Sequence, residues 1–256
     1  MRDNEKEYAS RNVQPLVVLA QHPFQLKRPK DLPGWNRWPK EVPAQALFDP
    51  LATVSATYGV AFQTQFRGNQ CQWSSRPTTF VIDRDGEIRG TYDKLHLFDV
   101  DLPTGESWRE SNVYSAGSGV VLVNGTPVGK VGLTICYDLR FPGLFARLAE
   151  ADADVIAVPA AFTVPTGKAH WHVLLRARAI EAGLFIVAAA QVGRHEDGRQ
   201  TFGHSLVVDP WGEVLLDMGE EQGVGFADVD LKRISDVRAR IPALNHRRAI
   251  PDAVTL

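Results

Sequence analysis

Cysteine is scarce in this sequence of 256 residues, which contains only Cys71 and Cys136. Two thiols cannot build a disulfide framework in a chain of this length, and neither belongs to a CxxC pair. A reducing compartment is therefore favoured, and we expect a cytoplasmic protein. Long hydrophobic runs are missing as well, since no apolar run approaches the roughly 18 residues of a membrane span. The start MRDNEKEYASRN is too polar for a signal peptide, so we expect no membrane association.

An excess of charge of one sign is also absent. The 28 basic and 30 acidic residues leave a formal net charge of −2. This balance predicts no basic surface for binding nucleic acid or an anionic membrane, and the three basic residues at 246–248 are too few to supply one. What remains is an ordinary globular composition, with 44% hydrophobic and 23% charged residues. We expect one domain spanning residues 1–256.

The order of apolar runs and turn signals predicts an α/β fold. An apolar strand candidate over 128–136 is followed by apolar residues at helical spacing over 144–148 and by the apolar run 153–162. This order indicates a strand, a tight turn, a helix and a second strand. Two hairpin signals, at Asp85-Gly86 and at Pro210–Gly212, require antiparallel strands in addition. Both kinds of connection together predict mixed sheets.

The remaining elements are assigned from their local patterns. Residues 15–20 (PLVVLA) form a short strand candidate, and 21–50 is a long, proline-rich irregular excursion. A helix is predicted over 169–181. We expect 224–231 (VGFADVDL) to close the sheet as a strand and 235–248 to form a tail.

Cys136 lies where the first strand of the βαβ unit turns into its helix. Ligands and chemistry collect at the carboxyl ends of strands in α/β sheets. A thiolate there can attack a carbonyl or nitrile carbon, and the N–H groups of Tyr137 and Asp138 suit the resulting oxyanion. The alternative is a structural role, because free cysteine is among the most often buried residue types.

Lys94 is the second candidate, because it leaves a hairpin strand between apolar neighbours. Beside a thiol, its ammonium group can stabilise the thiolate and a developing oxyanion and deliver a proton to a leaving amine. Taken alone, a lysine at a strand end is an exposed charge. Three carboxylates, Glu106, Glu110 and Asp138, lie near enough in sequence to orient Lys94 or Cys136. The histidines match no zinc-binding spacing, so we expect no metal.

Four ordered segments resemble the nitrilase superfamily of carbon-nitrogen hydrolases: YDKLHLFDVDLPTGESWRES, VGKVGLTICYDLRFP, VPAAFTVPTGKAHWHVLLRARAIE and AAAQVGRH with FGHSLVVDPWGEV. The likeness is greatest to the Nit branch of omega-amidases and deaminated glutathione amidases, and it is dense from about residue 80 to 248. It implies a four-layer α-β-β-α sandwich with mixed sheets, usually assembled as dimers or larger oligomers. It also implies hydrolysis of non-peptide C–N bonds by a Glu-Lys-Cys triad without any cofactor.

The resemblance also implies roles for single residues. Cys136 matches the nucleophile, Lys94 the triad lysine and Glu110 the auxiliary glutamate that holds the lysine. The backbone N–H of Tyr137 matches the oxyanion hole.

The amino-terminal part departs from the family pattern. Where the family has a strand ending in Leu-Pro-Glu, this chain has LVVLAQ, which places Gln21 at the glutamate that acts as general base. An amide cannot take up a proton, and loss of a positioned base typically costs about 10²–10⁴-fold in rate. His172 also stands where the family usually has a glutamate, and residues 1–45 are atypical as a whole.

The resulting expectation is an amidase that acts on a small carboxamide whose acyl half carries a carboxylate, through a cysteine acyl-enzyme, with activity lowered by Gln21. Two readings of the departure stay open: a degraded or redirected family member, and a chain whose start differs from the standard one. A catalytically inactive binding or scaffold protein is one alternative function. A Cys-His-Asp hydrolase using His172 or His204 is the other. We expect a homodimer or higher homo-oligomer.

Overall fold

The structure is a computed structural model. It describes the backbone of residues 17–20, 61–66 and 70–75, and residues 76–255 except 84–86, 103–104, 106 and 196–197. The expected base position Gln21, the excursion that follows it, Glu106 and the turn residues Asp85 and Gly86 lie outside the described residues.

A small antiparallel sheet has the strand order β1-β4-β5, with β1 at Val17–Ala20, β4 at Thr78–Ile82 and β5 at Ile88–Asp93. The predicted strand over 15–20 and the predicted hairpin around residue 85 are both confirmed by this sheet. Because β1 and β5 are each antiparallel to β4, they run in the same direction. The end of β1 and the end of β5, which is followed by Lys94, therefore lie at the same edge of the sheet.

The larger sheet has six strands in the order β15-β14-β11-β10-β9-β8. Its strands are β8 (Leu122–Thr126), β9 (Gly129–Leu133), β10 (Val155–Ala157), β11 (Phe185–Ala188), β14 (Leu206–Val208) and β15 (Val214–Asp217). The three central strands β9, β10 and β11 are parallel, and the outer strands are antiparallel to their neighbours. This arrangement confirms the predicted βαβ unit and the mixed sheet.

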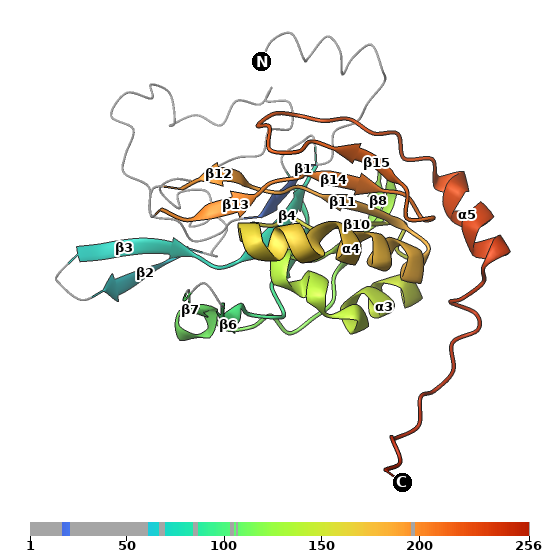
Figure 1. Ribbon diagram of the computed structural model, residues 1–256, viewed down its shortest axis with the longest axis horizontal. Helices are drawn as coiled ribbons and strands as arrows, with labels where there is room; N and C mark the ends of the chain where they lie inside the picture. Colours follow the sequence, from blue (N-terminus) through green and yellow to red (C-terminus); the bar gives the residue numbers. More distant parts are fainter. Residues whose placement is uncertain are drawn as a thin grey trace.

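Helices α3 (Pro142–Glu150) and α4 (Val164–Ala182) lie side by side against the large sheet (Figure 1). The core between them consists of fully buried side chains such as Leu148, Leu175 and Ile156. At Gly132 in β9, a Cβ atom would come within 2.9 Å of a Leu148 methyl group, so the missing side chain lets helix and strand approach closely here. The helix that follows the Cys136 turn is thereby held firmly against the sheet.

Three two-stranded pairs complete the strands of the described residues: β2 (Ala61–Phe66) with β3 (Gln70–Ser75), β6 (Asp99–Asp101) with β7 (Ser107–Arg109), and β12 (Val192–Arg194) with β13 (Gln200–Phe202). The pair β6–β7 leads directly into the short 3-10 helix η1 (Glu110–Asn112). It thus supports the segment that carries Glu110.

Two expectations for the carboxyl-terminal part were wrong. The segment 224–230 forms no strand, and residues 231–240, expected partly as tail, form helix α5 (Leu231–Arg240). The Asp230 side chain accepts a hydrogen bond from Lys232 N at 2.9 Å and caps the helix, while Ile234 and Val237 are buried. An N-cap followed by apolar residues three apart therefore outweighed the strand-like composition.

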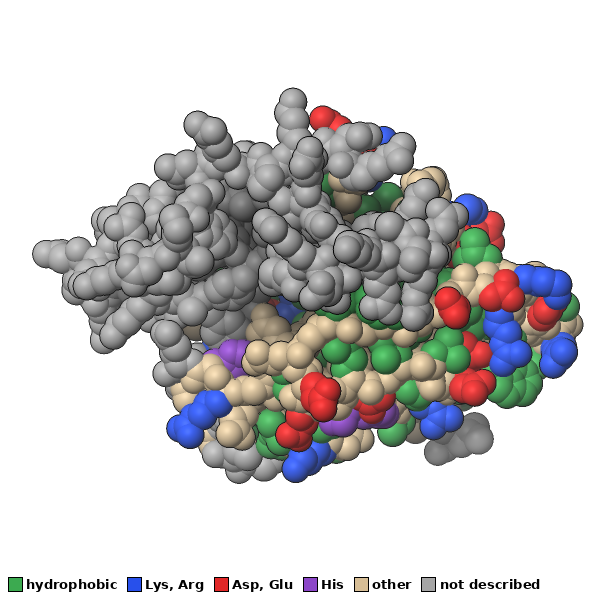
Figure 2. Space-filling view, turned by 90° about the horizontal axis from the view of Figure 1, so that it is seen from above, with side chains coloured by type: hydrophobic (Ala, Val, Ile, Leu, Met, Phe, Trp, Pro, Cys, Tyr) green, Lys and Arg blue, Asp and Glu red, His purple; other side chains and the backbone are tan. Residues whose placement is uncertain are grey.

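Acidic and basic side chains are interspersed over the coloured part of the surface in Figure 2, as the balanced net charge leads one to expect. Within the described residues, no helix combines the length and apolar character needed to cross a bilayer.

Candidate active site

Cys136 opens the 3-10 helix η2 (Cys136–Arg140), directly after β9 and its two-residue extension. Its φ is +48°, a left-handed conformation that costs a non-glycine residue about 1–2 kcal/mol. The Cys136 N–H donates to the Pro159 carbonyl at 2.9 Å, which fixes this strained residue to the end of the neighbouring strand. Strain that surrounding contacts maintain in this way is typical of functional sites.

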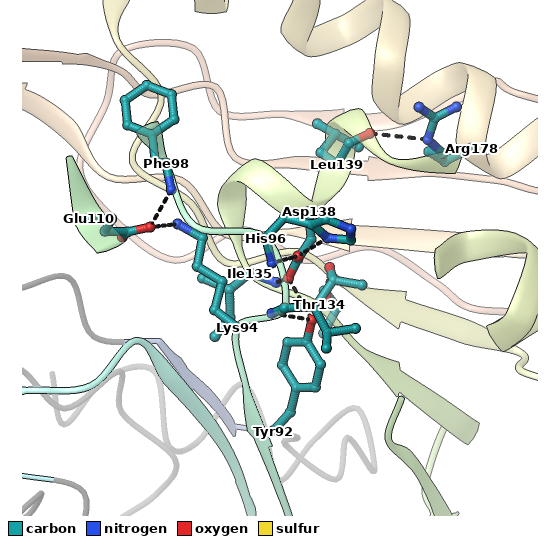
Figure 3. Close-up of polar contacts among 12 residues, drawn as sticks. Tyr92, Lys94, His96, Phe98, Glu110, Thr134, Ile135, Asp138, Leu139 and Arg178 are labelled. Atoms are coloured by element: carbon teal, nitrogen blue, oxygen red, sulfur yellow. Dashed lines mark hydrogen bonds and ion pairs between the residues drawn. The ribbon is translucent and has the colours of Figure 1, made fainter. Parts of the chain in front are cut away.

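A buried carboxylate holds the turn in place. Asp138, with no exposed surface, accepts hydrogen bonds from the Tyr92 hydroxyl at 2.7 Å, the Ile135 N–H at 2.9 Å and the His96 N–H at 3.0 Å (Figure 3). The His96 ring nitrogen Nδ1 lies 2.7 Å from the same carboxylate. Burial, together with the Asp138 charge, raises the pKa of Tyr92 far above its usual range, so its hydroxyl remains a donor. Asp138 thus joins the segment that carries Lys94 to the Cys136 turn.

Helix α4 supports the turn from the other side. The Arg178 side chain is 5% exposed and donates from Nε to the Leu139 carbonyl at 3.1 Å (Figure 3). Its guanidinium group also lies over the Phe145 ring, 5.5 Å from the centroid. The geometry around Cys136 is therefore fixed by β5, α3 and α4 together.

Lys94 and Glu110 form a buried ion pair. Lys94 Nζ lies 2.6 Å from Glu110 Oε2, and the two side chains are 1% and 7% exposed. The Phe98 N–H donates to the same oxygen at 2.7 Å, whereas Glu110 Oε1 has no hydrogen-bond partner among the described residues. Burial of such an ion pair costs desolvation free energy, and removal of either partner leaves an uncompensated buried charge.

Lys94 and Cys136 line the same pocket, of about 600 Å³ including the space open to solvent. Its walls combine aromatic rings with threonine hydroxyls and two guanidinium groups: Phe98, Trp108, Tyr137, Arg140, Phe162, Thr163, Thr166, Arg199 and Thr201 are among the lining residues. The Arg199 guanidinium lies over the Trp108 ring at 4.6 Å, and Arg140 lies over Phe162 at 5.4 Å. The pocket therefore suits a small, anionic, partly apolar molecule.

The predicted oxyanion donors are only partly supported by the geometry. The Asp138 N–H donates to the Ile135 carbonyl at 3.0 Å, so the expectation that it faces an oxyanion was wrong. This hydrogen bond closes the 3-10 turn, so the Asp138 N–H is already paired. Tyr137 lines the pocket, and no backbone hydrogen bond from its N–H is found among the described residues.

The structure thus brings Cys136, Lys94 and Tyr137 together around one pocket, and Glu110 contacts Lys94. His172 and His204 do not line it, and no other histidine appears among its described lining residues. Arg140 and Arg199 also line the pocket and were not predicted from the sequence. Arg140 could have been found from its place in the same turn, four residues after Cys136.

Burial raises the pKa of the Cys136 thiol, and the Lys94 charge and a backbone hydrogen bond at Ala161 offset this effect only in part. Because the thiolate is the reactive form, we expect slow alkylation of Cys136 by iodoacetamide at pH 7. The rate should rise with pH through a midpoint above that of an ordinary thiol, about 8.5.

The measurement is the rate of mass change in a Cys71→Ser background across a pH series. Lys94→Gln should move the midpoint to still higher pH, because it removes the nearby cation. A rate that is already constant below about pH 8 would contradict the assignment of a raised pKa.

Comparison with known proteins identifies the family. The carbon-nitrogen hydrolase family model matches residues 31–239. The deaminated glutathione amidase of Dictyostelium discoideum is 47% identical over 173 residues, which are 67% of this chain and 59% of that protein. The crystal structure of the Caenorhabditis elegans NitFhit protein superposes with a TM-score of 0.64 at 45% identity, covering 68% of this chain and 42% of that chain.

A third comparison concerns a glutamate-to-glutamine variant of the amidase from Nesterenkonia. It superposes with a TM-score of 0.50 at 26% identity, covering 64% of this chain and 57% of that chain. That structure shows covalent addition of the acetamide moiety of fluoroacetamide at the active-site cysteine.

The chain spans less than two thirds of the length of the deaminated glutathione amidases and of the NitFhit protein that it matches. The resemblance to the Nit branch and the α/β fold of the nitrilase type inferred from the sequence are nevertheless confirmed by these matches, and the large sheet is mixed as predicted whereas the small sheet is antiparallel. This chain belongs to the carbon-nitrogen hydrolase family.

Proposed function

We propose that this protein hydrolyses a small carboxamide, of the omega-amide or deaminated-glutathione kind, through an acyl-enzyme on Cys136. The observation that carries the proposal is the buried pair of Lys94 and Glu110, with Nζ and Oε2 2.6 Å apart, whose lysine lines the pocket that contains Cys136. Relatives named deaminated glutathione amidase support the reaction class. The nucleophile, the cation and the oxyanion donor of the proposal belong to the chain itself, so no cofactor is invoked.

In the proposed mechanism, the Cys136 thiolate attacks the amide carbonyl carbon and the carbonyl π electrons move to oxygen. The Tyr137 N–H and the Lys94 ammonium group stabilise this oxyanion. Collapse of the tetrahedral intermediate breaks the C–N bond, and ammonia leaves after accepting a proton from the Lys94 ammonium group, which takes a proton back from the attacking water in the next step. Water then attacks the thioester, which releases the carboxylate product and regenerates the thiol.

Two arginines support a substrate whose acyl half carries a carboxylate. Arg140 and Arg199 line the pocket together with Thr163, Thr166 and Thr201. A guanidinium group presents donors in a fork that matches the two oxygens of a carboxylate. A dicarboxylic omega-amide would place its amide at Cys136 and its far carboxylate toward these cations.

Fluoroacetamide tests the proposal directly, because its alkylation of a thiol requires only the nucleophile and a fitting pocket. The sulfur displaces fluoride, and an acetamide group remains on the protein. We expect one acetamide adduct by intact-mass measurement, full adduct formation in Cys71→Ser, and none in Cys136→Ala. Ammonia release from a panel of dicarboxylic omega-amides should disappear in the same Cys136→Ala variant.

The alternative functions lead to different results. A binding or scaffold protein would show no adduct, and Cys136→Ala would change no measured property. A Cys-His-Asp hydrolase would lose ester hydrolysis in His172→Gln or His204→Gln and would tolerate loss of Lys94. The positions of these histidines outside the pocket favour the lysine-dependent mechanism.

Self-association is part of the proposal. Ile180 on α4, Trp211 in the β14–β15 turn and Ile241 after α5 are each about half exposed, and all three surround one apolar hollow. Exposed apolar patches of this kind mark contact surfaces. A second copy of this chain is the partner that the resemblance implies.

A further inference from the structure

Three side chains from distant parts of the chain converge outside the active-site pocket. His172 lies in the middle of α4, His204 lies just before β14, and Asp217 ends β15. His172 Nε2 is 2.9 Å from Asp217 Oδ2, and His204 Nδ1 is 2.9 Å from Asp217 Oδ1. One potential ligand atom from each residue lies within 4.8 Å of the other two.

The backbone holds this cluster in position. His204 has a φ of +55°, its N–H donates to the Gly219 carbonyl at 2.7 Å, and its own carbonyl accepts from the Trp171 indole at 2.7 Å. The His204 ring also stacks on Phe202 with centroids 4.3 Å apart. The imidazole is thereby oriented by contacts that do not depend on Asp217.

Two imidazoles and a carboxylate are suitable ligands for a divalent transition metal. In a tetrahedral zinc site, bonds of about 2.0–2.2 Å separate the ligand atoms by roughly 3.3–3.5 Å. Measured to the single oxygen Asp217 Oδ2, the separations are 2.9 Å from His172 Nε2 and 3.1 Å from His204 Nδ1, so each needs to open by only about half an ångström or less to reach that spacing. The side chains are 35%, 23% and 32% exposed, which leaves water access to a fourth position.

We propose that His172 Nε2, His204 Nδ1 and the Asp217 carboxylate form a binding site for a divalent transition-metal ion, with zinc as the preferred occupant. On binding, the ion replaces the proton shared between each imidazole and the carboxylate. The site joins α4 to the β14–β15 hairpin, and it is independent of the amide chemistry at Cys136. The spacing of the histidines in the sequence shows no zinc pattern because the carboxylate comes from a third element.

The test uses tag-free, chelator-treated protein titrated with zinc in competition with a chromogenic chelator. We expect one equivalent bound, and visible absorption bands typical of nitrogen and oxygen ligands when cobalt replaces zinc. Asp217→Asn and His172→Gln should each weaken zinc binding at least about tenfold, since even outer-shell partners contribute 10–100-fold. Magnesium should not compete, because it prefers octahedral oxygen ligands.

Two controls locate the binding. His170→Gln changes a histidine on the same helix outside the cluster, and Cys136→Ala removes the buried thiol; both should keep full zinc affinity. Circular dichroism confirms that every variant is folded. Absence of stoichiometric zinc binding, or equal binding by Asp217→Asn, overturns the proposal and leaves the cluster as a hydrogen-bonded one.

Discussion

Replacement of Gln21 by glutamate is expected to raise the rate of amide hydrolysis by about 10²–10⁴-fold, the range that a positioned general base contributes. Burial raises the pKa of the Cys136 thiol, so a base is needed to remove its proton at neutral pH. β1 ends at Ala20, at the same sheet edge where β5 ends before Lys94. Gln21 directly follows β1 in the sequence, and the base is therefore introduced at this position.

The measurement is steady-state ammonia release from dicarboxylic omega-amides by wild type and Gln21→Glu. Gln21→Asn is the matched control, because it changes the side chain without adding a base, and it should stay at the wild-type rate. Gln21→Glu combined with Cys136→Ala should be inactive. Equal and robust turnover in wild type and Gln21→Glu would show that another carboxylate is the base. No turnover in either would favour the binding-protein alternative.

The sequence predicted the parts of the fold that local patterns determine. The turn at Pro210–Gly212 and the apolar run before Cys136 are short-range signals, and both elements form as expected. Asp138 was predicted only as one of three carboxylates that could orient Lys94 or Cys136, and its partners were not predictable in this way. Its partners Tyr92 and His96 lie more than 40 residues away and meet it only because β5 ends beside the Cys136 turn.

The residues of the candidate site likewise fall into those that the sequence predicted and those that it did not. Cys136, Lys94 and Glu110 were candidates from their places in the sequence and received their roles through resemblance, whereas Arg199 contributes to the pocket from the segment before β13 without any motif of its own. The cluster of His172, His204 and Asp217 shows the same limit, since two histidines 32 residues apart and an aspartate further on form no recognisable spacing. Long-range convergence of side chains depends on the packing of whole elements, which periodicity does not specify.

Glu110→Gln is expected to lower the free energy of unfolding by about 3–5 kcal/mol, the usual cost of removing one partner from a buried ion pair. The Lys94 side chain is only 1% exposed, so in Glu110→Gln its charge would contact neither solvent nor a carboxylate. Lys94→Met should cost a similar amount, because it leaves Glu110 charged and buried. Denaturant unfolding measures both values. The exposed pair Lys232–Asp236 supplies the control, since Lys232→Met should leave the unfolding midpoint unchanged.

Replacing both partners separates folding from chemistry. A buried ion pair exchanged for apolar groups of similar volume is often neutral or stabilising, so Lys94→Met with Glu110→Leu should be far more stable than the sum of the single changes predicts. The same double variant should form the fluoroacetamide adduct much more slowly, because the cation beside the thiol is gone. Such a result would mean that the pair serves the reaction at Cys136 and not the fold. If the double variant were as unstable as the sum of both single changes, and if its adduct formation were unchanged, the pair would be structural only and Lys94 would have no part in catalysis.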